Sequence, residues 1–217
     1  MRPITLTIPK ALVDVGGQPF IGRQLDYLKS QHITKVVLCL GYLGEQVVSY
    51  VGDGSRFGLA VSYSHDGEKL LGTGGALRRA VPLLGEQFFV LYGDSYLPCD
   101  FAAVQDAFIA AGKPALMTVL RNDDQWDRSN VLFQDGQLVE YNKSAPRTDM
   151  NHIDYGLGVL TADVLASVSD EAFDLATLYH RLSQTGQLAG FEVHQRFYEI
   201  GSPDGLRDAE NYFAGEL

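Results

Sequence analysis

The sequence contains few cysteines and no long apolar run. Only Cys39 and Cys99 occur among 217 residues, and neither has histidine or cysteine neighbours at ligand spacing, so we expect two thiols without a disulfide. No apolar run is long enough to cross a bilayer, and threonine, proline and lysine interrupt Met1–Lys10, where a secretory signal would lie. We therefore expect a cytoplasmic protein with no membrane partner.

Positive charge is also scarce. Lysine and arginine total 17 against 27 aspartates and glutamates, a formal net charge of −10. This balance argues against a broad basic face, so nucleic acid is not an expected partner. An acidic protein that binds anionic substrates needs a few well-placed cations, backbone-amide nests or a metal ion. The five histidines show no ligand spacing, and HExxH and nucleophile-elbow motifs are absent.

Apolar runs typical of strands alternate with helical patterns, which predicts an α/β fold. We expect strands over 35–40, 60–64, 88–92, 115–120, 131–133, 138–141 and 153–160, with an extended segment over 190–200. Expected helices cover 19–31, 45–51, 75–84, 101–111 and 175–183, and a last one begins at 202–203. The helix expected over 101–111 would end at Gly112. We predict a Rossmann-like mixed, mostly parallel sheet flanked by helices, with buried strands at 35–40 and 88–92.

Two carboxylates stand where strands end. Asp94 follows the apolar run Phe88–Tyr92, and Glu199 precedes Gly201 and the last predicted helix. Oxygen ligands at the carboxyl end of a strand suit Mg²⁺, and one or two carboxylates plus substrate phosphates commonly suffice. The alternatives are that Asp94 caps a turn and that Glu199 is a surface residue.

A glycine-rich stretch and two lysines offer further candidates. Leu70–Leu77 reads LLGTGGAL, in which glycines permit a close approach of backbone to ligand and the following helix offers N–H groups. It is neither a Walker A loop nor GxGxxG, and a simple turn into a helix is the alternative. Lys10 and Lys143 are cations suited to phosphate, although a lone lysine is usually a solvated surface charge.

The order of these motifs resembles a known family. RPITLTIPKALVDVGGQPFI, LGTGGAL, YGDS, IDYGLGV and FYEIGSP follow one another as in the sugar-1-phosphate nucleotidyltransferases, and the resemblance covers essentially the whole chain. It looks nearest to the bacterial branch that activates heptose 1-phosphate or N-acetylmuramate 1-phosphate. The resemblance implies the nucleotide-diphospho-sugar transferase fold and a reaction of a nucleoside triphosphate with a sugar 1-phosphate that releases pyrophosphate.

The resemblance also implies residue roles. Asp94 and Glu199 would bind Mg²⁺, although many relatives have aspartate at the second position. Asn142 stands where many relatives have glutamate facing the sugar. The implied catalytic cations are Lys10 and Lys143, the nucleotide site is Thr73, Gly74, Gly75 and Gly93, and the sugar site is Asn130, Asn142, Asp154 and Gly156.

One departure from the family pattern concerns the beginning of the chain. Family members start with a strand and a GGxGTR-type loop that holds the triphosphate, whereas Arg2-Pro3 resembles the residues just after that loop. We expect residues 1–217 to form a single, N-terminally truncated domain whose unmatched strands promote homo-oligomers. Three explanations stay open: a gene start further upstream, a truncated form with weak or no activity, and a non-catalytic nucleotide-sugar-binding protein. A metal-dependent glycosyltransferase is a more distant alternative, because Asp94 and Asp100 are too widely spaced for a DxD motif.

Overall fold

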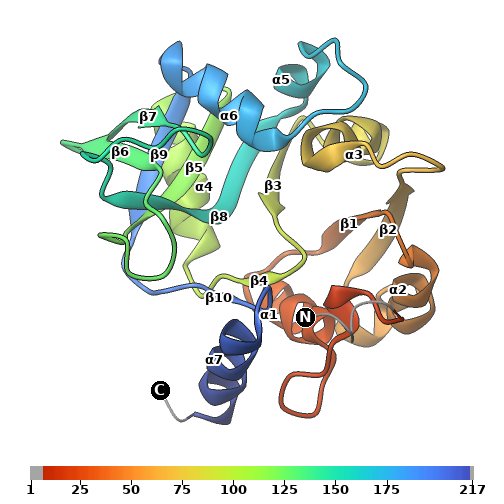
Figure 1. Cartoon of the computed structure of the whole chain (residues 1–217). Coiled ribbons are helices and arrows are strands. Elements are labelled where there is room, and N and C mark those ends of the chain that lie inside the picture. Colours follow the sequence, from red (N-terminus) through yellow and green to blue (C-terminus); the bar gives the residue numbers. More distant parts are fainter. Residues whose placement is uncertain (1–6, 216–217) are drawn as a thin grey trace. The chain divides into compact units, whose positions relative to one another are not determined.

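The computed structural model describes residues 7–215 and contains both helices and strands, which confirms the α/β class (Figure 1). The chain divides into two compact units. The first unit comprises Met1–Lys69, Tyr92–Tyr96 and Phe197–Leu217, and the second comprises Leu70–Leu91 and Leu97–Arg196. That residues 1–217 form a single truncated domain stays a prediction, and Arg2-Pro3 lies outside the described residues.

In its described part, the first unit contains two small sheets and three α-helices. Its elements are the 3₁₀ turns η2 (Lys10–Leu12) and η3 (Ser55–Phe57), the helices α1 (Phe20–Ser30), α2 (Gly44–Val51) and α7 (Pro203–Ala214), and the strands β1 (Lys35–Leu40), β2 (Ala60–His65), β4 (Ser95–Tyr96) and β10 (Tyr198–Glu199). β1 pairs in parallel with β2, and β4 pairs antiparallel with β10. α1 begins directly after Pro19, as expected, and buries Phe20, Leu25 and Leu28.

The prediction of a buried strand at 35–40 is correct for the strand and wrong for its burial. Lys35 is exposed, and the other residues of β1 are only partly buried. Among the described strands β1 pairs with β2 alone, so few neighbours cover its apolar side chains. β3 (Gln87–Leu91) likewise matches the strand expected at 88–92, but of its residues only Val90 is buried.

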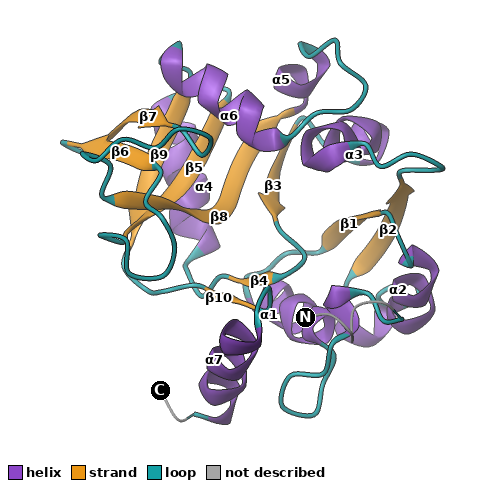
Figure 2. Cartoon of the chain, in the orientation of Figure 1, coloured by secondary structure: helices purple, strands orange, loops and turns teal. Residues whose placement is uncertain are grey.

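The second unit is a six-stranded sheet packed against helices (Figure 2). Its strands follow the order β7-β6-β8-β5-β9, and β3 pairs with β8. These strands are β5 (Ala115–Arg121), β6 (Val131–Gln134), β7 (Gln137–Tyr141), β8 (His152–Thr161) and β9 (Leu188–Val193). The helices are α3 (Gly72–Ala80), α4 (Phe101–Ala111), α5 (Ala162–Ala166) and α6 (Leu175–Gln184), with the 3₁₀ turn η4 (Val81–Leu83) after α3.

β5 lies between β8 and β9, and six of its seven residues are buried. Ala115, Met117 and Val119 join a core cluster with apolar residues of α6. In Figure 1, α6 and α4 cover opposite faces of the sheet. A strand buried on both faces reads as a continuous apolar run, which is why the sequence revealed it.

The expectation of a mostly parallel sheet is wrong. Within residues 7–215, only the pairs β1–β2 and β5–β9 are parallel, whereas β3–β8, β5–β8, β6–β7, β6–β8 and β4–β10 are antiparallel. The reason is the long strand β8, which runs antiparallel to both of its main neighbours. The predicted hairpin is confirmed: Asp135 and Gly136 have φ of 50° and 73° between β6 and β7, as a tight turn requires.

Two further boundaries differ from expectation. The segment expected to be extended over 190–200 is interrupted, since β9 ends at Val193 and β10 begins only at Tyr198. The helix expected over 75–84 begins earlier, at Gly72, and ends at Ala80, because Pro82 cannot donate the next helical hydrogen bond and lies in a 3₁₀ turn.

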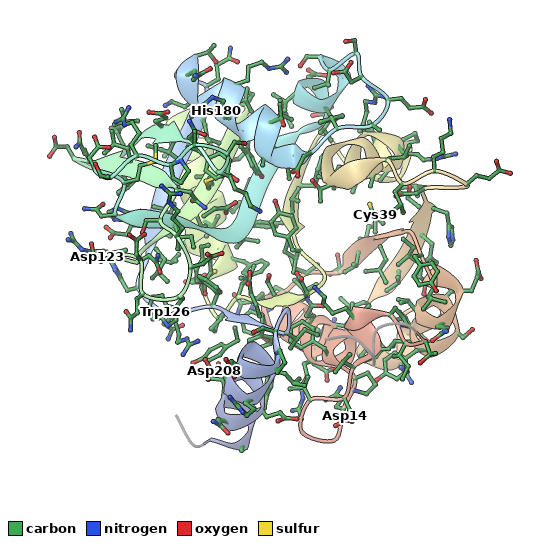
Figure 3. The ribbon with its side chains drawn as sticks, viewed as in Figure 1. Asp14, Cys39, Asp123, Trp126, His180 and Asp208 are labelled. Carbon is green, nitrogen blue, oxygen red and sulfur yellow. The ribbon has the colours of Figure 1, made fainter. Side chains whose placement is uncertain are left out.

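Cys39, labelled on β1 in Figure 3, and Cys99 are both thiols and form no disulfide. Burial raises the pKa of Cys39 to about 11 and that of Cys99 to about 12, and a nearby aspartate adds to each increase. None of the helices described between residues 7 and 215 is long and apolar enough to span a bilayer.

Candidate active site

Lys10 and Asp94 form an ion pair within the first unit. Asp94 lies in the turn between β3 and β4, and Lys10 begins η2. Lys10 Nζ donates to Asp94 Oδ2 at 2.9 Å, and the two side chains are 39% and 35% exposed. Each residue was predicted separately from the sequence as a site candidate. The structure shows that they are in contact although they lie 84 positions apart in the chain.

Glu199 is held beside this pair by the backbone. Its residue lies opposite Ser95 in the β4–β10 pairing, and Ser95 Oγ donates to Glu199 Oε1 at 3.3 Å. The next residue, Ile200, donates its N–H to the carbonyl oxygen of Asp94 at 3.0 Å. The two carboxylate residues therefore occupy neighbouring positions on paired segments.

A buried glutamine supports the turn that carries Asp94. Gln24 on α1 is 6% exposed, and its Nε2 donates to the carbonyl oxygens of Tyr92 and Ser95 at 3.0 and 2.8 Å. A buried amide needs such partners. Gln24 was not among the predicted site residues, although a glutamine on the apolar face of a predicted amphipathic helix was a usable signal.

Aromatic rings pack beneath β4 and β10. Tyr96 and Tyr198 join a core cluster with the fully buried Ile200 and Ala209. Tyr198 stacks on Tyr212 with ring centroids 4.3 Å apart, and burial raises the pKa of Tyr96. Because α7 supplies several of these groups, it fixes the strand that carries Glu199.

The second unit contains the glycine-rich candidates, which are engaged with the loop before α6. Thr73 Oγ1 donates to Asp174 Oδ1 at 3.0 Å and accepts from the Leu175 N–H at 2.8 Å. The Gly74 and Gly75 amides both donate to the Phe173 carbonyl, at 3.0 and 3.3 Å. These two N–H groups, expected to be available at the helix start, thus have partners within the chain. The assignment of Thr73, Gly74, Gly75 and Gly93 to a nucleotide stays a prediction.

The four sugar-site candidates lie in one hydrogen-bonded network of the second unit. Asn130 Oδ1 accepts from the Asp154 N–H at 3.0 Å, and Asp154 Oδ1 accepts from the Gly156 N–H at 2.9 Å. The Asn142 N–H donates to the Asn130 carbonyl at 2.8 Å. Lys143 follows Asn142 and is exposed. The four residues, which were chosen from the sequence only by their resemblance to a family pattern, are thus linked by hydrogen bonds in the structure.

Comparison with known proteins identifies the family. The family model described as "Nucleotidyl transferase" matches residues 1–129, more than half of the chain. The chain belongs to this nucleotidyl transferase family. The family recognition made from the motifs is therefore confirmed.

Individual relatives agree with this membership. An N-acetylmuramate alpha-1-phosphate uridylyltransferase of Neisseria meningitidis is 43% identical over 104 residues, which are 48% of this chain and 45% of that protein. An enzyme of the same name from Caulobacter vibrioides is 28% identical over 220 residues and covers 97% of this chain and 90% of its own. The chain spans about half the length, 45% to 58%, of several curated relatives that it matches.

The fold is also shared with a solved structure. HddC from Yersinia pseudotuberculosis, complexed with GMP-PN, has a TM-score of 0.84 at 22% identity and covers 98% of this chain and 93% of its own. This likeness supports the nucleotidyltransferase fold that the motifs implied.

The donor set of the first unit fits a hard divalent cation of the kind expected for this family. Asp94 and Glu199 supply only carboxylate oxygens, which Mg²⁺ prefers, and both are accessible to solvent. Among the described residues no group of three or more histidine, cysteine, aspartate or glutamate side chains is arranged to hold a metal. A two-carboxylate site completed by substrate phosphates is therefore the arrangement these residues could form.

Proposed function

We propose that this protein transfers a nucleotidyl group from a nucleoside triphosphate to a sugar 1-phosphate. The observation that carries the proposal is the Lys10–Asp94 pair beside Glu199 on paired strand segments of one unit. Membership of the nucleotidyl transferase family supports it. We also propose the cytoplasm as its location, because the reaction consumes nucleoside triphosphates.

In this reaction a phosphate oxygen of the sugar 1-phosphate attacks the α-phosphorus. A new P–O bond forms, the bond between the α-phosphorus and its bridging oxygen breaks, and pyrophosphate leaves with that electron pair. Lys10 offsets negative charge at the reacting phosphates, and Lys143 is proposed to do the same. No covalent bond to the protein is required, so the chain contributes positioning and electrostatic stabilisation.

Asp94 and Glu199 are proposed to hold Mg²⁺ in this site. When bound, the ion would supply positive charge to phosphate oxygens. The two carboxylates would hold the ion next to the paired strands β4 and β10. Lys10, which contacts Asp94 in the structure, would then be available to contact phosphate.

The residues of the second unit are proposed to bind the organic parts of the substrates. Thr73, Gly74 and Gly75 would line the base and ribose, and Gly93 is proposed as a further nucleotide-binding residue. Asn130, Asn142, Asp154 and Gly156 would recognise the sugar, and their shared hydrogen-bond network supports a common role. Asn142 in place of glutamate favours a sugar selectivity that differs from relatives with the acidic residue.

The test is pyrophosphate release with Mg²⁺, the common nucleoside triphosphates and a panel of sugar 1-phosphates. We expect Asp94→Asn to lower kcat by roughly two to three orders of magnitude, because a charge-stabilising contact is lost at the transferring phosphoryl group. Asp106→Asn, on an exposed position of α4, is the matched control and should leave kcat unchanged. Unchanged turnover in Asp94→Asn would contradict the proposed metal site.

The same assay separates the alternatives. It should include a version extended by any codons that precede this chain in the gene. Nucleotide-sugar binding without pyrophosphate release in either version would favour the non-catalytic binding protein. Glycosyl transfer to an acceptor, with no pyrophosphate formed, would favour the glycosyltransferase.

A further inference from the structure

The first turn of α7 lies against the backbone of Glu199. A Cβ atom added to Gly205 would stand 2.1 Å from the Glu199 carbonyl oxygen, a distance that real Cβ contacts do not show. Gly205 is helical and its φ is not in the left-handed region, so its backbone conformation suits any residue. Close approach alone therefore requires glycine at this position.

The same turn is fixed by a helix cap. Ser202 Oγ accepts a hydrogen bond from the Gly205 N–H at 3.0 Å, which ties the start of α7 to the segment that leaves β10. Farther along α7, the fully buried Ala209 packs in one core cluster with Ile200. The Ser202 cap before Gly205 and the packing of Ala209 after it thus hold Gly205 close to Glu199.

The close approach of Gly205 to the Glu199 carbonyl affects the positions of both Glu199 and Asp94. Glu199 is bonded through its side chain to Ser95, and the following Ile200 N–H donates to the Asp94 carbonyl. A displacement of the Glu199 carbonyl would therefore move Ile200 and alter the spacing of Glu199 from Asp94.

We propose that Gly205 is a positioning residue for divalent-cation binding: its missing side chain lets the first turn of α7 close on Glu199 and hold that carboxylate beside Asp94. The inference rests on the proposed function, since it presumes that Asp94 and Glu199 share a cation. Residues behind metal ligands commonly change metal affinity by about 10- to 100-fold when they are altered.

The decisive measurement is binding of Mn²⁺, an oxygen-binding and paramagnetic substitute for Mg²⁺, to the 217-residue chain by electron paramagnetic resonance. We expect Gly205→Ala to weaken Mn²⁺ binding about tenfold or more. Gly201→Ala is the matched control, because an added Cβ there meets nothing within 4 Å and should leave binding unchanged. Equal Mn²⁺ affinity in Gly205→Ala and wild type would overturn the inference.

Two further variants keep the test decisive. Ser202→Ala loosens the same turn without adding an atom, so it should weaken Mn²⁺ binding by a smaller factor even if Gly205→Ala does not fold. In a Glu199→Gln background, Gly205→Ala should cause no additional loss, because it acts through Glu199.

The outcomes also separate this inference from the proposed function. If Glu199→Gln weakens Mn²⁺ binding and both Gly205→Ala and Ser202→Ala leave it unchanged, the positioning role is wrong and the metal site stands. If wild type and Glu199→Gln bind Mn²⁺ equally, the metal assignment is wrong and the positioning role is overturned with it.

Discussion

At the scale of single residues, the Lys10–Asp94 ion pair should contribute little to the stability of the fold. Both side chains are more than a third exposed, so water and salt screen their attraction. An ion pair of this kind contributes about 1 kcal/mol or less to folding. If the proposed function is correct, the pair matters for activity instead, because Lys10 would supply positive charge to the reacting phosphates and Asp94 would bind a cation.

We therefore predict that Lys10→Met separates stability from activity. The free energy of unfolding in urea should change by about 1 kcal/mol or less, whereas kcat should fall by roughly two orders of magnitude because a cation at the phosphates is lost. Lys69→Met, at an exposed position of the same unit, is the control and should alter neither quantity. A large loss of stability with normal kcat would show that Lys10 is a structural residue.

The sequence suggested individual candidate residues, but it did not show which of them lie together. Asp94 was identified because a carboxylate ends a buried-looking strand, and Glu199 because it precedes a capped helix. Their placement on paired segments depends on hydrogen bonds between residues 104 positions apart, which no local pattern encodes. Gln24 was missed for the same reason, since its partners are backbone carbonyls of Tyr92 and Ser95.

At the scale of elements, the start of α3 packs tightly against the loop that precedes α6. A Cβ added to Gly74 would lie 2.1 Å from the Phe173 ring, and one added to Gly75 would lie 2.6 Å from the Glu171 carbonyl oxygen. Thr73 completes the contact through Asp174 and the Leu175 amide. Tight packing of two elements accounts for these glycines independently of any ligand.

This packing predicts that Gly74→Ala lowers the free energy of unfolding by about 1–3 kcal/mol, the usual cost of overpacking. Phe173→Leu should restore part of the loss in the double variant, because the two sites share one contact. Gly85→Ala, whose added Cβ makes only an ordinary 3.7 Å contact, serves as the control in urea titrations. If the double variant regains stability but nucleotide binding stays weak, Gly74 has a second role at the nucleotide.

At the scale of the whole molecule, the order of elements was predictable and their pairing was not. Every strand expected from apolar periodicity is present, apart from the interruption near residues 194–197, because local patterns report which residues face a core. The direction of a strand depends on partners far along the chain. Because β8 runs antiparallel to β3 and β5, the sheet is not mostly parallel as expected. The two-residue strand β4 was missed because it is too short to show a period.

The pH dependence of global stability follows from the thiol on β1. The pKa of Cys39 is about 11 in the folded protein against an ordinary value of 9.0, chiefly because the partial burial of the side chain disfavours the charged thiolate. Below pH 9 the folded and unfolded states both hold the proton, so this group adds no pH dependence. Between about pH 9 and 11 the unfolded state loses the proton first, and stability should fall by at most about 1.4 kcal/mol per pH unit from this group.

The prediction is tested by urea unfolding of wild type and Cys39→Ala at several pH values from 8 to 11. Tyrosines and lysines titrate in the same range, so the difference between the two proteins, and not the fall itself, reports on Cys39. That difference should be constant below pH 9 and then change steadily in favour of the alanine variant. A difference that stays constant up to pH 11 would mean that the folded protein does not hold the Cys39 proton more tightly than the unfolded chain does.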